Sequence, residues 1–321
     1  MREQTTVPLE ARSFSSAHFS YMEGCGLKEP VFKGSCTAMI TPFRTNEIDY
    51  ERLKRQLAFQ AGNGTSAVVI AGTTGENATL SEREYEMLAA FCVRETDGRM
   101  KVILGVGGNN TQKCMDNARF AKCVGADAVL MTPPYYNKTS PAGLEAHFLR
   151  VADAVDIPLI LYNVPGRTAI GIPAESYRRL AEHPNINGVK ESSGNLSLIT
   201  EIAAECAGKL WIWSGNDDHT IAMMALGAQG VVSVAANLLP GEMARLCKLC
   251  LNGDFGGANA LYAAYAPLMR ALFVETNPIP VKAAMALLDM DGGQLRQPLV
   301  PISETNLELL KRCLENTGVL R

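Results

Sequence analysis

The sequence predicts an α/β protein: a (β/α)₈ TIM barrel followed by a C-terminal helical segment. From Gly34 onward, short runs of apolar and β-branched residues alternate with longer amphipathic runs, which is typical of βα units around a parallel sheet. Eight strand-like runs follow one another, about one βα unit apart, and eight such units close a barrel. After Pro240 the strand-like runs stop and helical patterns continue.

The predicted strands are residues 34–41, 66–72, 101–107, 127–132, 158–164, 186–192, 210–215 and 230–235. Amphipathic runs between them predict helices. In residues 50–62, Tyr50, Leu53 and Leu57 are spaced for one helix face. The run 81–96 begins with Ser81 and Glu84, which predict a capping box.

An open, doubly wound sheet is the competing architecture. Such sheets often bind dinucleotides through a G-x-G-x-x-G loop after a strand. The best candidate here, GVGGNN at 105–110, has Asn110 where the third glycine is required. The pattern therefore favours the barrel and disfavours an NAD-dependent oxidoreductase.

Composition indicates an ordinary globular chain. The 321 residues are 47% hydrophobic and 20% charged, with a formal net charge of −3, so the basic excess typical of nucleic-acid or anionic-membrane binding is missing. No apolar run approaches the roughly 20 residues of a membrane span. The nine cysteines are odd in number and mostly single within apolar runs, which indicates free thiols and a cytoplasmic protein.

Three regions are expected. Residues 1–31 predict a flexible N-terminal extension without a signal peptide, although Met22 is an alternative start. Residues 32–240 are expected to form the barrel. Residues 241–321 are expected to be a helical segment packed on it, used for packing or as oligomer surface.

Lys190, in the run INGVKESSGN, is the outlier among the strand-end residues. In a barrel, active sites form at the C-terminal ends of the strands. An apolar strand disfavours the charged ammonium and so favours the free amine, the nucleophile of Schiff-base chemistry on a carbonyl. The alternative is that Lys190 reaches solvent or pairs with Glu191.

Other strand ends carry further candidates. Thr73 and Thr74, between glycines, suit a small carboxylate or phosphate nest, or simply a polar turn. Tyr162 can pass protons if it lies near the lysine, or can serve only for packing. Arg167 is placed to bind a substrate carboxylate, or to form a surface ion pair.

Tyr135 and Tyr136 could extend a proton relay. Asp217 and Asp218 follow the seventh strand, where phosphate-binding barrels often hold their ligand, and so disfavour phosphate. No metal is expected, because the four histidines are scattered and Cys247-x-x-Cys250 stands alone in a helical pattern.

Six motifs, in the order in which they occur along the chain, resemble those of the pyruvate-dependent class I aldolases, and most closely those of the dihydrodipicolinate synthase family. The resemblance runs from about Phe32 to the C-terminal helices. Its motifs are GTTGE (72–76), TPPYYN (132–137), YNVPGRT (162–168), VKESSGN (189–195), SGND (214–217) and GVVSV (230–234).

The resemblance implies a synthase that condenses pyruvate with L-aspartate 4-semialdehyde to 4-hydroxy-tetrahydrodipicolinate, for lysine and diaminopimelate biosynthesis. It assigns the Schiff base to Lys190, and a proton relay to Thr74, Tyr162 and Tyr136, the last donated across a dimer interface. It implies a homotetramer, a dimer of dimers, without metal or nucleotide cofactor.

The resemblance also assigns substrate contacts. Thr73 and Thr74 would hold the pyruvate carboxylate, and Arg167 the carboxylate of the aldehyde. Gly215 and Val232 would line the lysine pocket through their backbone.

Alternatives within the family are an N-acetylneuraminate lyase and a keto-deoxy-sugar-acid aldolase. Thr73 and Arg167 favour the synthase over the first, and Arg167 with the paired tyrosines over the second. A catalytically inactive barrel acting as a sensor is a further alternative.

The resemblance also predicts a vestigial effector site at Asn109, Lys113, Tyr135, Glu82 and Tyr85. Relatives inhibited by lysine carry an acid where Lys113 stands. Because Lys113 repels a lysine ammonium, we expect weak or absent lysine feedback.

Overall fold

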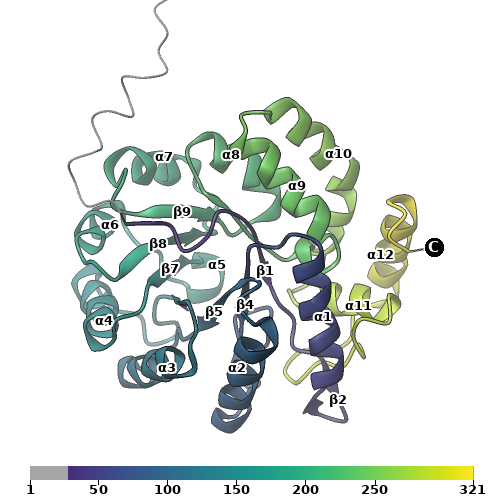
Figure 1. The fold of residues 1–321 in the computed structure, drawn as a ribbon, viewed down its shortest axis with the longest axis horizontal. Coiled ribbons are helices and arrows are strands. Elements are labelled where there is room, and N and C mark those ends of the chain that lie inside the picture. The colour runs from purple at the N-terminus through teal and green to yellow at the C-terminus, as the bar shows by residue number, and fades with distance from the viewer. Residues whose placement is uncertain (1–27, 321) are drawn as a thin grey trace, which may run out of the picture.

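A computed structural model describes residues 28–320, and within them eight parallel strands close into a barrel surrounded by helices (Figure 1). The strand order is β1-β10-β9-β8-β7-β6-β5-β4, and β1 pairs with both β10 and β4. The predicted (β/α)₈ barrel is confirmed, and the open sheet is excluded because no edge is left between the first and last strands. Residues 1–27, with His18, Met22 and Cys25, lie outside the described range.

All eight predicted strands form. The barrel strands are β1 (Gly34–Ala38), β4 (Ala67–Ile70), β5 (Lys101–Gly105), β6 (Ala128–Met131), β7 (Leu159–Asn163), β8 (Ile186–Glu191), β9 (Trp211–Ser214) and β10 (Gly230–Ser233). A small hairpin, β2 (Phe43–Arg44) and β3 (Glu47–Ile48), follows β1. The observed strands end one to three residues before the predicted ends, because those residues leave the ladder to form the loops that carry the site.

Helices follow each barrel strand. The helices are α1 (Tyr50–Gly62), α2 (Glu82–Thr96), α3 (Thr111–Val124), α4 (Pro141–Ala154), α5 (Pro165–Thr168), α6 (Ala174–Ala181), α7 (Leu196–Glu205), α8 (Thr220–Ala225), α9 (Pro240–Leu251), α10 (Phe255–Ala271), α11 (Ile279–Leu287) and α12 (Glu304–Asn316). Single 3₁₀ turns are η1 (Asn77–Thr79), η2 (Asp217–His219) and η3 (Ala235–Asn237). The predicted capping box is present: Ser81 and Glu84 accept from each other's backbone N–H groups at the start of α2.

The hydrophobic core has two layers, because successive side chains of a strand face opposite sides. One layer lies between the strands and the helices. The other fills the barrel, where Trp213 is fully buried and Phe32 stacks on it, with ring centres 4.9 Å apart. The stacked rings of Trp213 and Phe32 fill one end of the barrel interior, and the site can form at the opposite end.

Residues 28–31, placed in the flexible extension by the sequence prediction, are bound to the barrel. The Lys28 ammonium donates to the carbonyl oxygens of Ala181, His183 and Ile186 at 2.7–2.8 Å. Ala181 is the last residue of α6, where carbonyl groups lack an intrahelical donor, and Lys28 supplies one. Asn187 adds hydrogen bonds to the backbone of residues 29 and 31.

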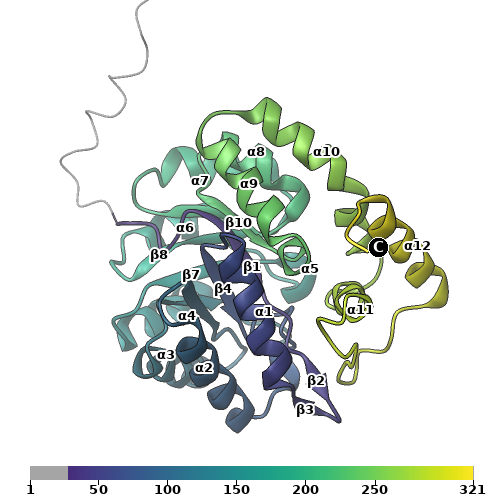
Figure 2. The same cartoon turned by 45° about the vertical axis from the view of Figure 1, so that its right-hand side comes forward.

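The C-terminal helices form a group beside the barrel (Figure 2). Helix α9 packs on β1, β10 and α8, and so is the eighth helix of the barrel. The predicted boundary after residue 240 therefore falls one helix early. Helix α10 packs on α9 and α12, and α11 packs on α12.

A buried ion pair ties α11 to the loop after β4. Lys282 is fully buried, and its ammonium lies 2.7 Å from a carboxylate oxygen of Glu76. It also donates to the carbonyl oxygens of Thr41 and Gln294, and it lies over the ring of Phe43. The appended segment is thus bonded to the mouth of the barrel.

The cysteines of the described residues are all free thiols, buried apart from Cys123. Cys247 and Cys250 lie in α9 without a disulfide, which agrees with a role in the core. None of the helices in residues 28–320 is both long and apolar enough to cross a membrane.

Candidate active site

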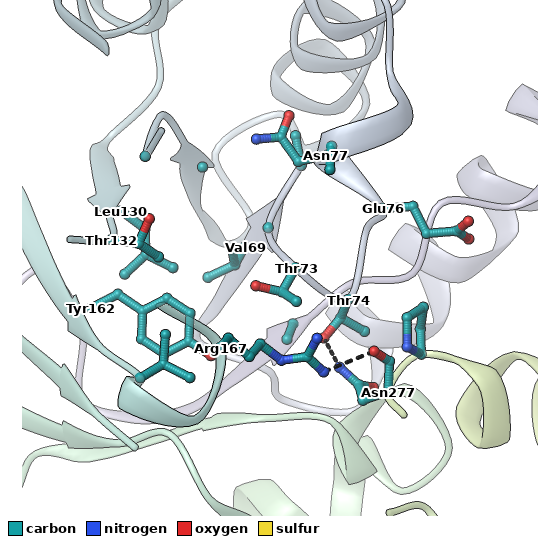
Figure 3. A pocket seen from close by; sticks show the side chains of 18 of the residues that line it. Val69, Thr73, Thr74, Glu76, Asn77, Leu130, Thr132, Tyr162, Arg167 and Asn277 are labelled. Carbon is teal, nitrogen blue, oxygen red and sulfur yellow. Dashed lines mark hydrogen bonds between the residues drawn. The ribbon is translucent and has the colours of Figure 1, made fainter. Parts of the chain in front are cut away.

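A cavity of about 310 Å³ opens at the C-terminal ends of the strands (Figure 3). Its floor includes Val69 of β4, Leu130 of β6 and Lys190 of β8. Its wall includes residues of the loops after β4 and β7. One side comes from the C-terminal segment, through Asn277, Pro278, Pro298 and Leu299.

Lys190 and Tyr162 lie side by side in this cavity. They are register partners on β8 and β7, and both are largely buried, 6% and 8% exposed. The Lys190 ammonium nitrogen lies 4.2 Å from the centre of the Tyr162 ring. The neighbouring strands thus hold a nucleophile and a phenol together inside the barrel.

Glu191 does not pair with Lys190, so the alternative that the two residues form an ion pair is wrong. Its side chain points to the opposite face of β8, as strand alternation requires. There its carboxylate accepts from Asn163 at 2.8 Å, Tyr177 at 3.1 Å and the backbone N–H of Ser193 at 2.6 Å. Burial beside this carboxylate raises the pKa of Tyr177 well above its usual value.

Thr73, Thr74 and Arg167 line the same cavity. Thr74 is 4% exposed. The Arg167 guanidinium lies beside it, held by a 2.9 Å hydrogen bond to the backbone carbonyl of Asn277 (Figure 3). The structure therefore brings together five side chains from two barrel strands, one loop and the short helix α5: Lys190, Tyr162, Thr73, Thr74 and Arg167.

Asn277 is a site residue that the sequence prediction missed. It lies between α10 and α11, far along the chain from the barrel motifs, and its amide donates to the Thr74 hydroxyl at 2.9 Å. The only sequence signal is the proline that follows it, which marks a loop but not its place.

The two tyrosines after β6 behave differently. Tyr135 lines the cavity, whereas Tyr136 is 92% exposed and does not line it. Tyr136 also has a φ of +67°, a left-handed conformation that is uncommon for a tyrosine. This exposure is compatible with the expected donation of Tyr136 to a second subunit.

Of the two residues expected to line the lysine pocket, Gly215 lies close to Lys190. An added Cβ at Gly215 would stand 1.8 Å from Oγ of Ser192 and 2.9 Å from Cε of Lys190, so the glycine leaves room for both side chains. Val232 is buried in the barrel interior. Asp217 is also buried and accepts from the backbone N–H groups of Val234 and Ala235; burial raises its pKa.

A second cavity, of about 200 Å³, lies beside the first. Tyr135 lines both cavities. The predicted effector residues Asn109, Lys113, Glu82 and Tyr85 all line the second. The structure thus brings the five residues of that prediction to one place.

Within residues 28–320, no cluster of three or more His, Cys, Asp or Glu side chains could hold a metal ion. His147 is buried and bonds to Thr111, and His183 lies beside Asp153.

The chain matches the model of the dihydrodipicolinate synthetase family over residues 31–317. It belongs to that family. A relative from Thermoanaerobacter sp. (strain X514), named 4-hydroxy-tetrahydrodipicolinate synthase, is 44% identical over 293 residues, which cover 91% of this chain and 99% of the relative.

Solved structures of dihydrodipicolinate synthases support the same family assignment. The dihydrodipicolinate synthase of Aquifex aeolicus is 43% identical with a TM-score of 0.89, covering 90% of this chain and 99% of that one. The enzyme of Acinetobacter baumannii, solved in complex with pyruvate, is 37% identical with a TM-score of 0.88, covering 90% and 99%. The resemblance inferred from the six motifs is therefore confirmed.

Proposed function

We propose that this chain is a 4-hydroxy-tetrahydrodipicolinate synthase, which condenses pyruvate with L-aspartate 4-semialdehyde through a Schiff base on Lys190. The observation that carries the proposal is the buried pair of Lys190 and Tyr162 at the base of the cavity. Relatives at this level of identity bear that name, and one structural neighbour was solved with pyruvate.

The first half of the reaction activates pyruvate. The free amine of Lys190 attacks the keto carbon of pyruvate, and loss of water gives an iminium ion. This ion acts as an electron sink, so the methyl group loses a proton and an enamine forms. Thr73 and Thr74 supply hydroxyl groups for the pyruvate carboxylate, next to the lysine.

The second half forms the carbon–carbon bond. The enamine carbon attacks the aldehyde carbon, and the aldehyde oxygen takes up a proton. The amino group of the second substrate then attacks the former keto carbon and displaces Lys190, which closes the ring and frees the enzyme. Arg167, fixed by Asn277, is placed to bind the carboxylate of this substrate bidentately.

Protons move through Tyr162 and Thr74 in this proposal, because both lie in the cavity and are shielded from solvent. We place Tyr136 of a second subunit at the end of this relay. The chain would then act as a homotetramer, a dimer of dimers, in which each active site is completed by the partner.

The proposal also covers the cell context. The product would feed lysine and diaminopimelate biosynthesis in the cytoplasm. The reaction needs no metal or nucleotide cofactor, because the covalent lysine imine supplies the electron sink.

The direct test is substrate choice. Purified protein is incubated with pyruvate and L-aspartate 4-semialdehyde, and separately with N-acetylneuraminate or 2-keto-3-deoxygluconate. We expect the cyclic product in the first reaction, with kcat/KM at least about a hundredfold above the cleavage of either sugar acid, because a site built to pair a substrate carboxylate rejects analogues that leave it unpaired. Faster cleavage of a sugar acid would assign the chain to another branch, and no turnover of any substrate would favour the inactive sensor.

A further inference from the structure

We propose that Trp213 is a positioning residue for Lys190: its ring fills the barrel interior beneath the lysine and keeps the amine directed at the cavity. Residues 28–32, which we call the N-terminal strap, hold that ring in place. The inference rests on the proposed function and deepens it, because it concerns how the Schiff-base lysine is held.

Trp213 lies on the strand next to Lys190. The two are register partners on β9 and β8, as Lys190 and Tyr162 are on β8 and β7. Partners in register on neighbouring strands face the same side of a sheet. Trp213 and Tyr162 both belong to the core inside the barrel. Lys190 therefore stands in one row between a phenol ring and an indole ring.

Gly188 shows where the indole ring lies. Residues 188 and 190 are two apart on β8 and so face the same side of the strand. An added Cβ at Gly188 would stand 2.5 Å from Cζ3 of Trp213, so the ring occupies the space of a side chain at position 188. The ring is fully buried and does not line the cavity. It therefore lies beneath Lys190, toward the N-terminal end of the strands.

A lysine needs such support to act as a nucleophile. Its four-carbon stem is flexible, and attack on a carbonyl requires the amine to be held in one direction. Tyr162 restricts the stem on one side, with its ring centre 4.2 Å from the ammonium nitrogen. The indole ring fills the space below, so the stem cannot fold away from the cavity into the barrel.

The N-terminal strap contacts both tryptophans of the chain. The indole N–H of Trp213 donates to the carbonyl oxygen of Phe32 at 3.2 Å, and the rings of these two residues stack. The indole N–H of Trp211 donates to the carbonyl oxygen of Lys28 at 2.7 Å. In Figure 1 the strap is the purple segment that runs beside β9. The strap thus fixes the strand that carries the ring.

The contacts continue from the outside of the barrel to the site. The Lys28 ammonium binds carbonyl oxygens at the end of α6 and the start of β8. Phe32 supports Trp213, and Trp213 supports Lys190. The match to the family begins at residue 31, so Lys28 lies before the part of the chain that the family model covers. The strap therefore acts on the Schiff-base lysine although none of its residues lines the cavity.

Two variants test the support from different sides. Trp213→Leu removes the indole ring and keeps an apolar side chain. Phe32→Leu leaves Trp213 in place and removes only the ring stacked on it.

The control is Phe148→Ala, in α4. Phe148 is fully buried in the core layer between the strands and the helices, and it does not line the cavity. Its truncation removes more of a side chain than Trp213→Leu does, so the control reports the cost of lost core packing alone.

Imine formation is measured by mixing each protein with pyruvate at several concentrations and adding borohydride after increasing times. Circular dichroism gives the folded fraction of each preparation. We expect Trp213→Leu to lower the maximal rate of imine formation in the folded chains at least about tenfold, because a misplacement of about 1 Å can cost roughly a hundredfold. The pyruvate concentration that gives half this rate should stay within about threefold of wild type, because the groups that bind the carboxylate are unchanged.

The other two proteins bracket this result. Phe32→Leu should slow imine formation at least about threefold, because the indole ring loses its stacked neighbour. Phe148→Ala should unfold at a lower temperature than wild type and keep the wild-type rate within about twofold, because it changes packing far along the chain from the lysine and its neighbours.

The outcomes separate the positioning role from the synthase assignment. If Trp213→Leu forms the imine at the wild-type rate, or if Phe148→Ala slows it as much, Trp213 serves only core packing and the inference is wrong. A wild-type rate in Phe32→Leu overturns the part assigned to the strap, and this variant decides the question alone if Trp213→Leu does not fold. If the wild-type protein forms no adduct with pyruvate, the proposed function itself fails.

Discussion

The buried pair of Lys282 and Glu76 joins the C-terminal segment to the loop that carries Thr73 and Thr74, and Lys282→Met tests its strength. Lys282 and Glu76 have side chains that are 0% and 1% exposed, and the ammonium nitrogen lies 2.7 Å from the carboxylate. The same nitrogen lies 4.0 Å from the carboxylate of Asp291. The substitution leaves both carboxylates buried without their cation.

The expected loss in free energy of unfolding is about 3–5 kcal/mol, the usual cost of removing one partner of a buried ion pair. Three hydrogen bonds of Lys282, to Glu76, Thr41 and Gln294, are lost together. Such a loss is a large part of the roughly 5–15 kcal/mol that stabilises a folded domain. The double variant Glu76→Gln, Lys282→Met removes the unpaired charge of Glu76, so it should be more stable than Lys282→Met alone.

Urea unfolding at one fixed protein concentration measures these differences. Lys54→Met is the matched control, because Lys54 has a side chain that is 62% exposed and pairs with Glu95 at the surface, where such pairs contribute about 0–1 kcal/mol. The reasoning is refuted if Lys282→Met costs no more than Lys54→Met. It is also refuted if the double variant is no more stable than the single one, because the unpaired charge would then not be the cause.

Three further predictions concern pH, the lysine pocket and regulation. Burial raises the pKa of Asp291 to about 6, so its ionisation destabilises the folded state as the pH rises from about 4 to about 6. Asp291→Asn should therefore have a free energy of unfolding up to about 3 kcal/mol above that of wild type at about pH 7, and no such advantage at about pH 4. Urea unfolding at the two pH values measures the difference. Gly215→Ala should slow imine trapping with pyruvate at least about tenfold, because its Cβ would stand 1.8 Å from Oγ of Ser192 and 2.9 Å from Cε of Lys190 and would displace the lysine side chain. Lysine at sub-millimolar concentration should not halve the condensation rate, because Lys113 lines the second cavity.

Each of these has a clear contrary result. A stability difference between Asp291→Asn and wild type that is the same at about pH 4 and about pH 7 would mean that Asp291 does not titrate in this window. If Gly215→Ala traps pyruvate at the wild-type rate, the Lys190 side chain is not displaced by an added methyl group at this position. Half-inhibition by sub-millimolar lysine would show that Lys113 does not exclude this ligand.

The barrel could be predicted because its signal is local. Each strand is a short apolar run buried on both faces, and each helix shows one apolar face, so the count of eight units is visible in the sequence. The strands were predicted to end too late because buried apolar residues continue beyond the last hydrogen-bonded strand residue, as at Val106 and Val234. Helix α9 was assigned to the appended segment because its packing on β1 depends on closure of the barrel.

The site could be predicted in part. Lys190, Tyr162, Thr74 and Arg167 lie at or just after strand ends, and the rule that barrel sites form there brings them together. Asn277 follows no strand, and its place depends on how α10 and α11 pack, which periodicity does not encode. The role of Glu191 was left open because the direction of a strand-end side chain depends on register.

The most direct test of the central claim is borohydride reduction of the full-length protein in the presence of pyruvate, followed by peptide mass spectrometry. We predict one added reduced pyruvate group per chain, located on Lys190, and none in Lys190→Met. An unmodified chain, or a label on another lysine with Lys190 free, would contradict the claim.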